Sequence, residues 1–279
     1  IFKNFFVSIL GITLILLSPR IFAESFYNSR DIFFMCLFIF YLNSMYNFIN
    51  SKNIKNIVFF SLFTAIILNA KILGYIPVLI FLVLYSYNYL NTKEKLLSKK
   101  KIIFLYFSLS FFFIYILWPY LWDDPLGNLF FALKNVVKIQ QDIILINHYF
   151  GEYLPSDLVP WHFRLVWFLI TTPVIILFLF ILGLVLFFKE ICKKIGSTLD
   201  NKKDFSQKQF INIFLFMVFL FSFFILMEFN KSKYGGWRHL YFLYPIVIYF
   251  SLLFINHLLQ NSSNIFRNTI FIFIFFNLA

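Results

Sequence analysis

The chain has 279 residues, of which 61% are hydrophobic and 13% charged, and 45 of them are Phe. Soluble domains are roughly half apolar and about a quarter charged, so this composition excludes a protein that faces water on all sides. The formal net charge of +12 would also suit nucleic acid, but the Lys residues lie in connections between long apolar runs, which argues against nucleic acid and favours a membrane as the partner.

The long apolar runs predict membrane-spanning helices, because about 20 apolar residues cross the hydrocarbon of a bilayer and backbone groups in lipid must bond internally. They predict an all-α polytopic membrane protein with nine spans, the last incomplete. Residues 69–77 form either a tight re-entrant turn or a kink in one long element. The expected spans are residues 2–18, 31–50, 56–71, 73–90, 102–121, 163–188, 209–228, 240–259 and 268–279.

The two ends of the sequence bear on the extent of the domain. The chain starts at Ile1 rather than Met and stops at Ala279 within an apolar run. We therefore expect a single transmembrane domain, residues 1–279, that is cut at both ends from a longer polytopic protein. No signal peptide is recognisable, because no basic region precedes the first apolar run.

The distribution of charge predicts the orientation. With the N-terminus in the cytosol, 15 of the 24 basic and four of the 12 acidic residues lie inside, giving +11 there and +1 outside. The positive-inside rule describes this asymmetry. We expect a multi-pass protein of the plasma (inner) membrane whose functional groups gather on the extracytoplasmic side.

The connection 122–162 is the longest on the outer side and differs from the Lys-rich inner loops by its mixed charge, Trp and Pro content. It contains an amphipathic stretch, Leu126 to Ile139, which predicts a helix lying on the outer membrane surface. The apolar face comprises Leu129, Leu133, Val136 and Val137, and Lys134 and Lys138 face elsewhere.

Few residues suit a metal ion. Cys36 lies in an apolar run, Cys192 lies in a Lys-rich connection, and no two of the four His stand at i, i+4. Asp123 and Asp124 suit either a cation or a solvated turn that caps the next helix. Without a third carboxylate nearby, a divalent metal is not indicated, and we expect no metal and no cofactor.

Charged residues near membrane depth need a partner or a function, because lipid solvates them poorly. Asp31 begins an expected span, where a carboxylate caps free N–H groups, and this structural role can coexist with a catalytic one. Lys71 either extends its side chain to the interface or binds a ligand. Other residues of this kind are Arg164, Glu228, Arg238 and His239.

Arg238 and His239 point most directly to an anion. A guanidinium fork beside an imidazole suits a phosphate, and Gly235 and Gly236 let the backbone approach a ligand. The structural alternative is an interfacial Arg that contacts lipid headgroups. Two other features have structural interpretations: Trp118 to Trp122 as an aromatic belt at the interface, and Thr171-Thr172-Pro173 as a kink.

Polar residues of the outer side gather in four ordered clusters. These are Ser18-Pro19-Arg20 to Asp31, Trp118-Pro119-Tyr120-Leu121-Trp122 to Pro125, Pro160-Trp161 to Thr171-Thr172-Pro173, and Tyr234-Gly235-Gly236-Trp237-Arg238-His239-Leu240-Tyr241-Phe242. Together they resemble the bacterial family 39 glycosyltransferases, dolichyl-phosphate-mannose protein mannosyltransferase-like proteins of the GT-C superfamily. The resemblance covers residues 18 to about 245.

The resemblance implies a GT-C-like helix bundle with extracytoplasmic loops. The expected enzyme is a mannosyltransferase-like hexosyltransferase that moves a sugar from a polyprenyl-phosphate carrier to a lipid, glycan or protein acceptor outside the cytosol. Asp31 matches an acidic position with a supporting catalytic role, whereas the principal acid of the family is expected upstream of Ile1, so this chain alone is expected to be inactive. The expected donor-phosphate site comprises Arg238, His239, Lys71, Arg20, Tyr234 and Trp122.

Three alternatives stay open at this point. A lipid-linked glycan polymerase or ligase shares the lipid-phosphate chemistry but joins preassembled glycans. A transporter or flippase is a different class; transporters place polar residues near the bilayer midplane in broken helices and internal repeats, and neither pattern is evident in this sequence. A degenerate fragment without activity is the third alternative.

Overall fold

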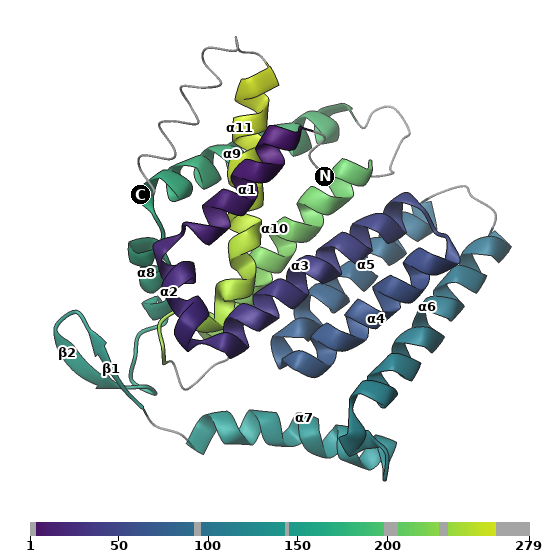
Figure 1. Cartoon of the computed structure of the whole chain (residues 1–279), viewed down its shortest axis with the longest axis horizontal. Coiled ribbons are helices and arrows are strands. Elements are labelled where there is room, and N and C mark those ends of the chain that lie inside the picture. Colours follow the sequence, from purple (N-terminus) through teal and green to yellow (C-terminus); the bar gives the residue numbers. More distant parts are fainter. Residues whose placement is uncertain (1–3, 92–95, 143–144, 198–205, 229–233, 261–279) are drawn as a thin grey trace. The chain divides into compact units, whose positions relative to one another are not determined.

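The computed structural model describes residues 4–91, 96–142, 145–197, 206–228 and 234–260, almost all of them helical (Figure 1). Contacts divide the chain into two compact units, which we describe one at a time. Unit 1 is Ile1–Met35, Trp167–Asp204 and Leu240–Ala279, and unit 2 is Cys36–Val166 and Phe205–His239. The single transmembrane domain stays a prediction.

The elements follow each other in this chain order. They are α1 (Phe5–Leu16), α2 (Pro19–Tyr27), α3 (Ser29–Asn50), α4 (Ile54–Ala70), η1 (Ile72–Gly74), α5 (Tyr75–Asn91), α6 (Leu96–Leu117), η2 (Pro119–Leu121), α7 (Pro125–Asp142), β1 (Ile146–Tyr149), β2 (Glu152–Pro155), α8 (Phe163–Thr171), α9 (Val174–Ser197), α10 (Gln207–Glu228), η3 (Arg238–Leu243) and α11 (Tyr244–Gln260), where η marks a 3₁₀ helix.

Several of these helices have the length and apolar character of membrane spans. Within the described residues five qualify, and a sixth does if the bent pair of α1 and α2 is one span. The prediction of a largely helical membrane protein is thereby confirmed in its coarse form. The count of nine stays a prediction, because α4 and Ile72–Asn88 are shorter and residues 268–279 lie outside the described part. The five are Ser29–Asn50, Lys100–Leu117, Val174–Lys193, Gln207–Met227 and Arg238–Gln260.

Helix breaks lie beside two prolines. The predicted span 2–18 ends as α1 at Leu16, close to its expected end, and α2 then starts at Pro19 with a bend of 58°. The run 163–188 is divided into α8 and α9 next to Pro173, which confirms the predicted kink. Proline has no N–H to donate to the preceding turn. At this second break the Thr171 hydroxyl donates to the Trp167 carbonyl at 2.6 Å.

The segment between α4 and α5 is a tight turn. Lys71 has extended backbone, with φ at −160°, and ends α4. Gly74 then lies so close to α4 that a Cβ on it would stand 2.1 Å from the Ile67 carbonyl oxygen. Of the two alternatives for residues 69–77, the structure therefore shows a turn rather than one kinked helix.

Aromatic rings form the core of unit 2. Phe60 of α4 stacks on Tyr106 of α6 with centroids 5.0 Å apart, and it meets Phe81 of α5 edge-on at 4.8 Å. Phe48 of α3 stacks on Phe60 at 5.1 Å. Thr64 adds a hydroxyl contact of 3.1 Å to the Tyr106 hydroxyl. Helices α3, α4, α5 and α6 therefore meet around rings with defined geometry, which ring quadrupoles favour.

Unit 1 is built by close packing of α11 against α9 and α1. A Cβ on Gly183 of α9 would stand 1.9 Å from the Phe250 carbonyl oxygen of α11, and one on Gly11 of α1 would stand 2.7 Å from the Leu252 Cδ1. The Ser251 hydroxyl donates to the Ile176 carbonyl at 3.3 Å. Small residues at such contacts let helix backbones approach, and in lipid this packing replaces the hydrophobic effect.

The predicted helix in connection 122–162 is confirmed as α7 (Pro125–Asp142). Asp124 caps it, accepting from the Gly127 N–H at 3.0 Å, so this carboxylate has the structural role weighed against a cation. Leu129 is half-buried and Lys134 exposed, in line with the two expected faces. The side chains of Leu133, Val136, Val137 and Lys138 lie outside the described part.

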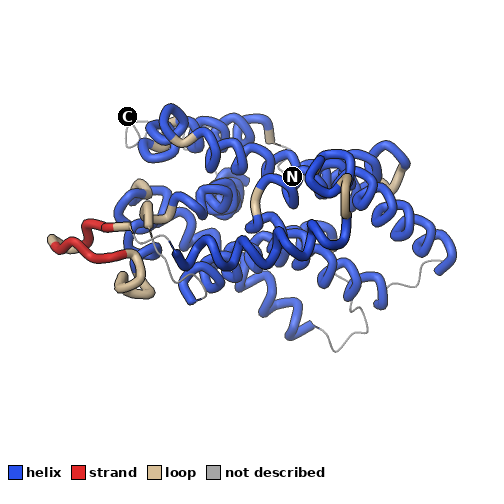
Figure 2. The backbone as a smooth tube through the Cα atoms, turned by 90° about the horizontal axis from the view of Figure 1, so that it is seen from below, coloured by secondary structure: helices blue, strands red, loops and turns tan. Residues whose placement is uncertain are grey.

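A β-hairpin follows α7 and departs from the all-α prediction. Strands β1 and β2 pair antiparallel with His148 opposite Tyr153 (Figure 2, red). The two turn residues, Phe150 and Gly151, have φ of +49° and +88°, as a type I′ turn requires. Each strand has four residues, too few for alternation of polar and apolar residues to stand out in the sequence.

We predict that Gly183→Ala destabilises unit 1. The new methyl group would meet the Phe250 carbonyl, a backbone atom that cannot turn aside, and overpacking of this kind costs about 1–3 kcal/mol. Thermal unfolding in detergent should show a lower midpoint for this variant. The neighbouring Val185→Ala, at a side chain that is 43% exposed, is the control and should leave the midpoint nearly unchanged.

Candidate functional site

The residues expected in the site fall in both units, and we describe those of each unit by themselves. In unit 1 we define the Arg20 cluster as Arg20, Glu24 and Tyr241. In unit 2 we define the Tyr234 cluster as Arg164, Tyr234, Arg238 and His239. The other expected site residues are Asp31 in unit 1 and Lys71 and Trp122 in unit 2.

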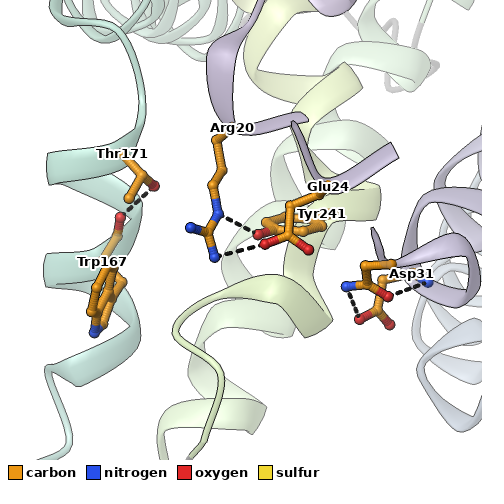
Figure 3. Close-up of polar contacts among 7 residues, drawn as sticks. Arg20, Glu24, Asp31, Trp167, Thr171 and Tyr241 are labelled. Atoms are coloured by element: carbon orange, nitrogen blue, oxygen red, sulfur yellow. Dashed lines mark hydrogen bonds and ion pairs between the residues drawn. The ribbon is translucent and has the colours of Figure 1, made fainter. Parts of the chain in front are cut away.

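In the Arg20 cluster the guanidinium is held by two partners (Figure 3). Arg20 Nε donates to the Tyr241 hydroxyl at 2.7 Å, and its Nη2 lies 2.8 Å from Glu24 Oε1, one turn further along α2. The Arg20 and Glu24 side chains are 33% and 18% exposed. A phosphate that approached Arg20 would therefore compete with a carboxylate already paired to it.

Asn28 caps the start of α3 and contacts Asp31, the residue to which the sequence assigned that role. Asp31 is the third residue of α3 and only 6% exposed. The Asn28 side chain accepts from the Asp31 N–H at 3.2 Å and donates to the Asp31 carboxylate at 2.8 Å. This reciprocal pair satisfies the start of the helix. The supporting catalytic role stays a prediction.

In the Tyr234 cluster two side chains pack on one phenol ring. The Arg238 Cζ lies 5.0 Å from the centroid of the Tyr234 ring, in a cation–π contact. The His239 ring meets the same ring edge-on, with centroids 5.1 Å apart. The structure thus brings together three of the residues that the sequence assigned to a donor phosphate.

The two glycines make this arrangement possible. Gly235 and Gly236 have φ of +67° and +62°, the left-handed region that favours glycine. A Cβ on Gly235 would also stand 2.6 Å from Arg238 Nε, so the guanidinium folds back over the bare backbone. The Arg238 N–H donates to the Gly235 carbonyl at 3.3 Å and closes the turn. Trp237, 1% exposed, anchors the turn in the core.

Arg164 adds a second guanidinium to the Tyr234 cluster. It is fully buried and its Nη1 donates to the Leu226 carbonyl in the last turn of α10. The Tyr234 side chain interacts with it electrostatically. An arginine keeps its charge at neutral pH, so the cluster holds two guanidinium charges.

The environment of Arg238 Nε in the Tyr234 cluster suits an anionic ligand. Arg238 Nε is buried and meets no hydrogen-bond acceptor within the residues that the structure describes. A buried donor without a partner is costly, and an anionic ligand would remove that cost. The side chain of Glu228, a further charged residue from the sequence, lies outside the described part.

Trp122 and Lys71 lie elsewhere in unit 2. Trp122 is 55% exposed and its indole N–H donates to the Tyr115 carbonyl near the end of α6 at 2.9 Å. This exposed ring with a bonded polar tip is typical of an aromatic belt at a membrane interface. Lys71 is half-buried at the end of α4. Their contribution to a donor site stays a prediction.

Sequence reasoning missed the partners of Arg20. Glu24 stands at i, i+4, a spacing that predicts an ion pair on a helix, so the sequence did contain this signal. Tyr241 is 221 positions away, and nothing local marks it as the second partner. Asn28 likewise has the side chain that a helix start prefers.

No group of three or more His, Cys, Asp or Glu that could hold a metal ion occurs among the described residues. No protein-family model matches this chain, and neither a curated protein nor a solved structure shows significant similarity to it. We therefore infer the function from the residues themselves.

We predict that Arg164→Leu destabilises unit 2, because the Leu226 carbonyl would lose its charged donor. Hydrogen bonds to charged groups contribute about 1.5–3 kcal/mol. The thermal unfolding midpoint in detergent should fall. Arg30→Leu, at an exposed arginine of α3, is the matched control. Equal midpoints for the two variants would contradict a structural role for Arg164.

Proposed function

We propose that this protein is a membrane glycosyltransferase that transfers a sugar from a polyprenyl-phosphate carrier to a lipid, glycan or protein acceptor on the extracytoplasmic side. The observation that carries the proposal is the Tyr234 cluster, where Arg238 and His239 pack on the Tyr234 ring, the buried Arg164 interacts with it electrostatically, and Arg238 Nε meets no acceptor among the described residues. The ordered motifs that resemble the family 39 glycosyltransferases support the same chemistry.

A lipid-phosphate donor needs a cationic site in an apolar protein. When the bond between the sugar and the phosphate oxygen breaks, negative charge develops on the phosphate, and donors already aimed at it lower the barrier. In our proposal Arg238 hydrogen-bonds that phosphate with its fork, and His239 adds a further donor. Tyr234 orients both through its ring.

The acceptor needs a base. Its hydroxyl attacks the sugar carbon and transfers its proton to a carboxylate within hydrogen-bond reach. Asp31 has a carboxylate that the Asn28 amide holds in place, so we assign it a supporting role and not that of the principal base. Arg20 is the weaker phosphate ligand, because Glu24 already neutralises it.

We predict that Arg238→Ala lowers sugar transfer about 100-fold, the effect of losing one donor to a developing oxyanion. Arg238→Lys should recover only part of the activity, because an ammonium lacks the planar fork. The measurement is transfer of radiolabelled sugar from a polyprenyl-phosphate carrier in membranes that contain the complete protein. Arg30→Ala is the control and should match the wild type. Unchanged transfer by Arg238→Ala would refute the donor-phosphate assignment.

One structural feature favours a second candidate, a transporter or lipid-linked glycan flippase. Helices α1 and α2 form a pair bent by 58°, and transporters build their sites from discontinuous helices. Proteoliposomes that contain the protein and a labelled lipid-linked sugar separate the two functions. We expect transfer to an acceptor; movement of the intact donor across the bilayer without chemical turnover would favour the transporter.

The same assay separates a monosaccharide transferase from a glycan polymerase or ligase. We expect activity with a polyprenyl-phosphate monosaccharide and little with a lipid-linked oligosaccharide. The opposite preference would identify an enzyme that joins preassembled glycans.

A further inference from the structure

A pocket of about 560 Å³ lies within unit 2 where α3 is followed by α4. None of its residues belongs to the Tyr234 cluster or to the other residues proposed for the sugar donor. Its polar lining includes Asn43, Asn47 and Lys55, and its apolar lining consists of Phe40, Phe59 and Phe63. The pocket is therefore amphipathic.

Hydrogen bonds within the connection hold the polar end of this pocket in shape. Asn53 caps α4, accepting from the Asn56 N–H at 2.8 Å. The Asn56 side chain donates to the Asn47 carbonyl at 3.0 Å and to the Ser51 carbonyl at 2.8 Å. Asn43 and Asn47 stand one turn apart on α3, so both carboxamides line the same side of a preformed pocket.

The apolar end consists of rings that are open to the surroundings. Phe40 of α3 stacks on Phe63 of α4 with centroids 5.5 Å apart and planes 10° apart. Phe40 is 54% exposed and Phe59 is 47% exposed. On apolar helices of this kind such rings face lipid chains, whereas Lys55 in the first turn of α4 marks the level of the headgroups.

The charge of this end indicates which lipid fits. Lys52 and Lys55 belong to the side of the chain for which the sequence predicts a net charge of +11, the cytosolic side. Basic pockets between helices on that side bind anionic headgroups. A zwitterionic lipid would bring an ammonium group next to Lys55, which disfavours it.

We propose that the pocket binds one anionic glycerophospholipid of the cytoplasmic leaflet. Its phosphate pairs with the Lys55 ammonium, the Asn43 and Asn47 amides donate to oxygens of the headgroup and glycerol ester region, and the acyl chains begin along Phe40 and Phe63. The site is independent of the sugar donor, so it stands or falls separately from the proposed function.

The test measures lipid retention by the purified protein. The protein is equilibrated in detergent with equal amounts of phosphatidylglycerol and phosphatidylcholine, and bound lipid is identified by native mass spectrometry. We expect preferential retention of phosphatidylglycerol and about a fivefold loss in Lys55→Ala, the factor that corresponds to one basic residue at an anionic surface. Asn47→Leu, which keeps the backbone carbonyl used by Asn56, should also lower retention.

Matched controls decide between this site and general surface charge. Lys101→Ala removes an exposed Lys of α6 that is not part of the pocket and should leave retention unchanged. Excess glycerol 3-phosphate should not displace the lipid, because the rings contribute to binding. Equal retention of the two lipids, an equal loss in Lys101→Ala, or displacement by glycerol 3-phosphate would each overturn the proposal. Unchanged elution on size exclusion confirms that the variants fold.

Discussion

Backbone hydrogen bonding in lipid is the constraint on which this structure depends. A bilayer interior offers no partner to a free N–H or C=O group, so the apolar segments are helical and the free groups at helix ends need other partners, among them side chains. Asn28 and Asp31 satisfy the start of α3, and Arg164 donates to the Leu226 carbonyl near the end of α10. Polar clusters at helix ends therefore have a structural reason that is independent of function.

Two arginines of the expected donor site have different environments because their neighbours in the sequence differ. Arg20 stands one turn before Glu24 on a helix, where the Glu24 carboxylate neutralises its charge and its Nε donates to the Tyr241 hydroxyl. Arg238 follows two glycines in left-handed conformation, and it folds back over the Tyr234 ring instead. An anion gains more from the second arrangement than from the first, which is why our proposal centres on Arg238 and not on Arg20.

Packing in both units depends on shape more than on a gain from leaving water. Gly183 and Gly11 allow α11 to lie against its neighbours, and stacked rings such as Phe60 and Tyr106 join the helices of unit 2. Since lipid tails are as apolar as these side chains, contact geometry has to supply the stability. The exposed rings near Lys55 can pack against a lipid in the way that the buried rings pack against a neighbouring helix.

The sequence by itself determined the features that depend on local order. Run length and apolar content predicted the helices. Pro173 predicted the interruption between α8 and α9, and the spacing of apolar residues predicted the helix α7. The sequence also predicted that Tyr234, Arg238 and His239 lie together, because they are close in the chain and the glycine pair between them forms a turn. Each of these follows from interactions within a few residues.

Only the tertiary structure decided the rest. No local pattern in the sequence encodes three of its features. These are the contact of Tyr241 with Arg20, the position of Arg164 near Tyr234, and the pocket between α3 and α4. The hairpin after α7 depends on pairing between two strands of four residues each, too short to be recognised by alternation. The contact of Arg20 with Tyr241 and the position of Arg164 near Tyr234 depend on helix packing, because these residues are far apart in the sequence and meet only after the helices have packed.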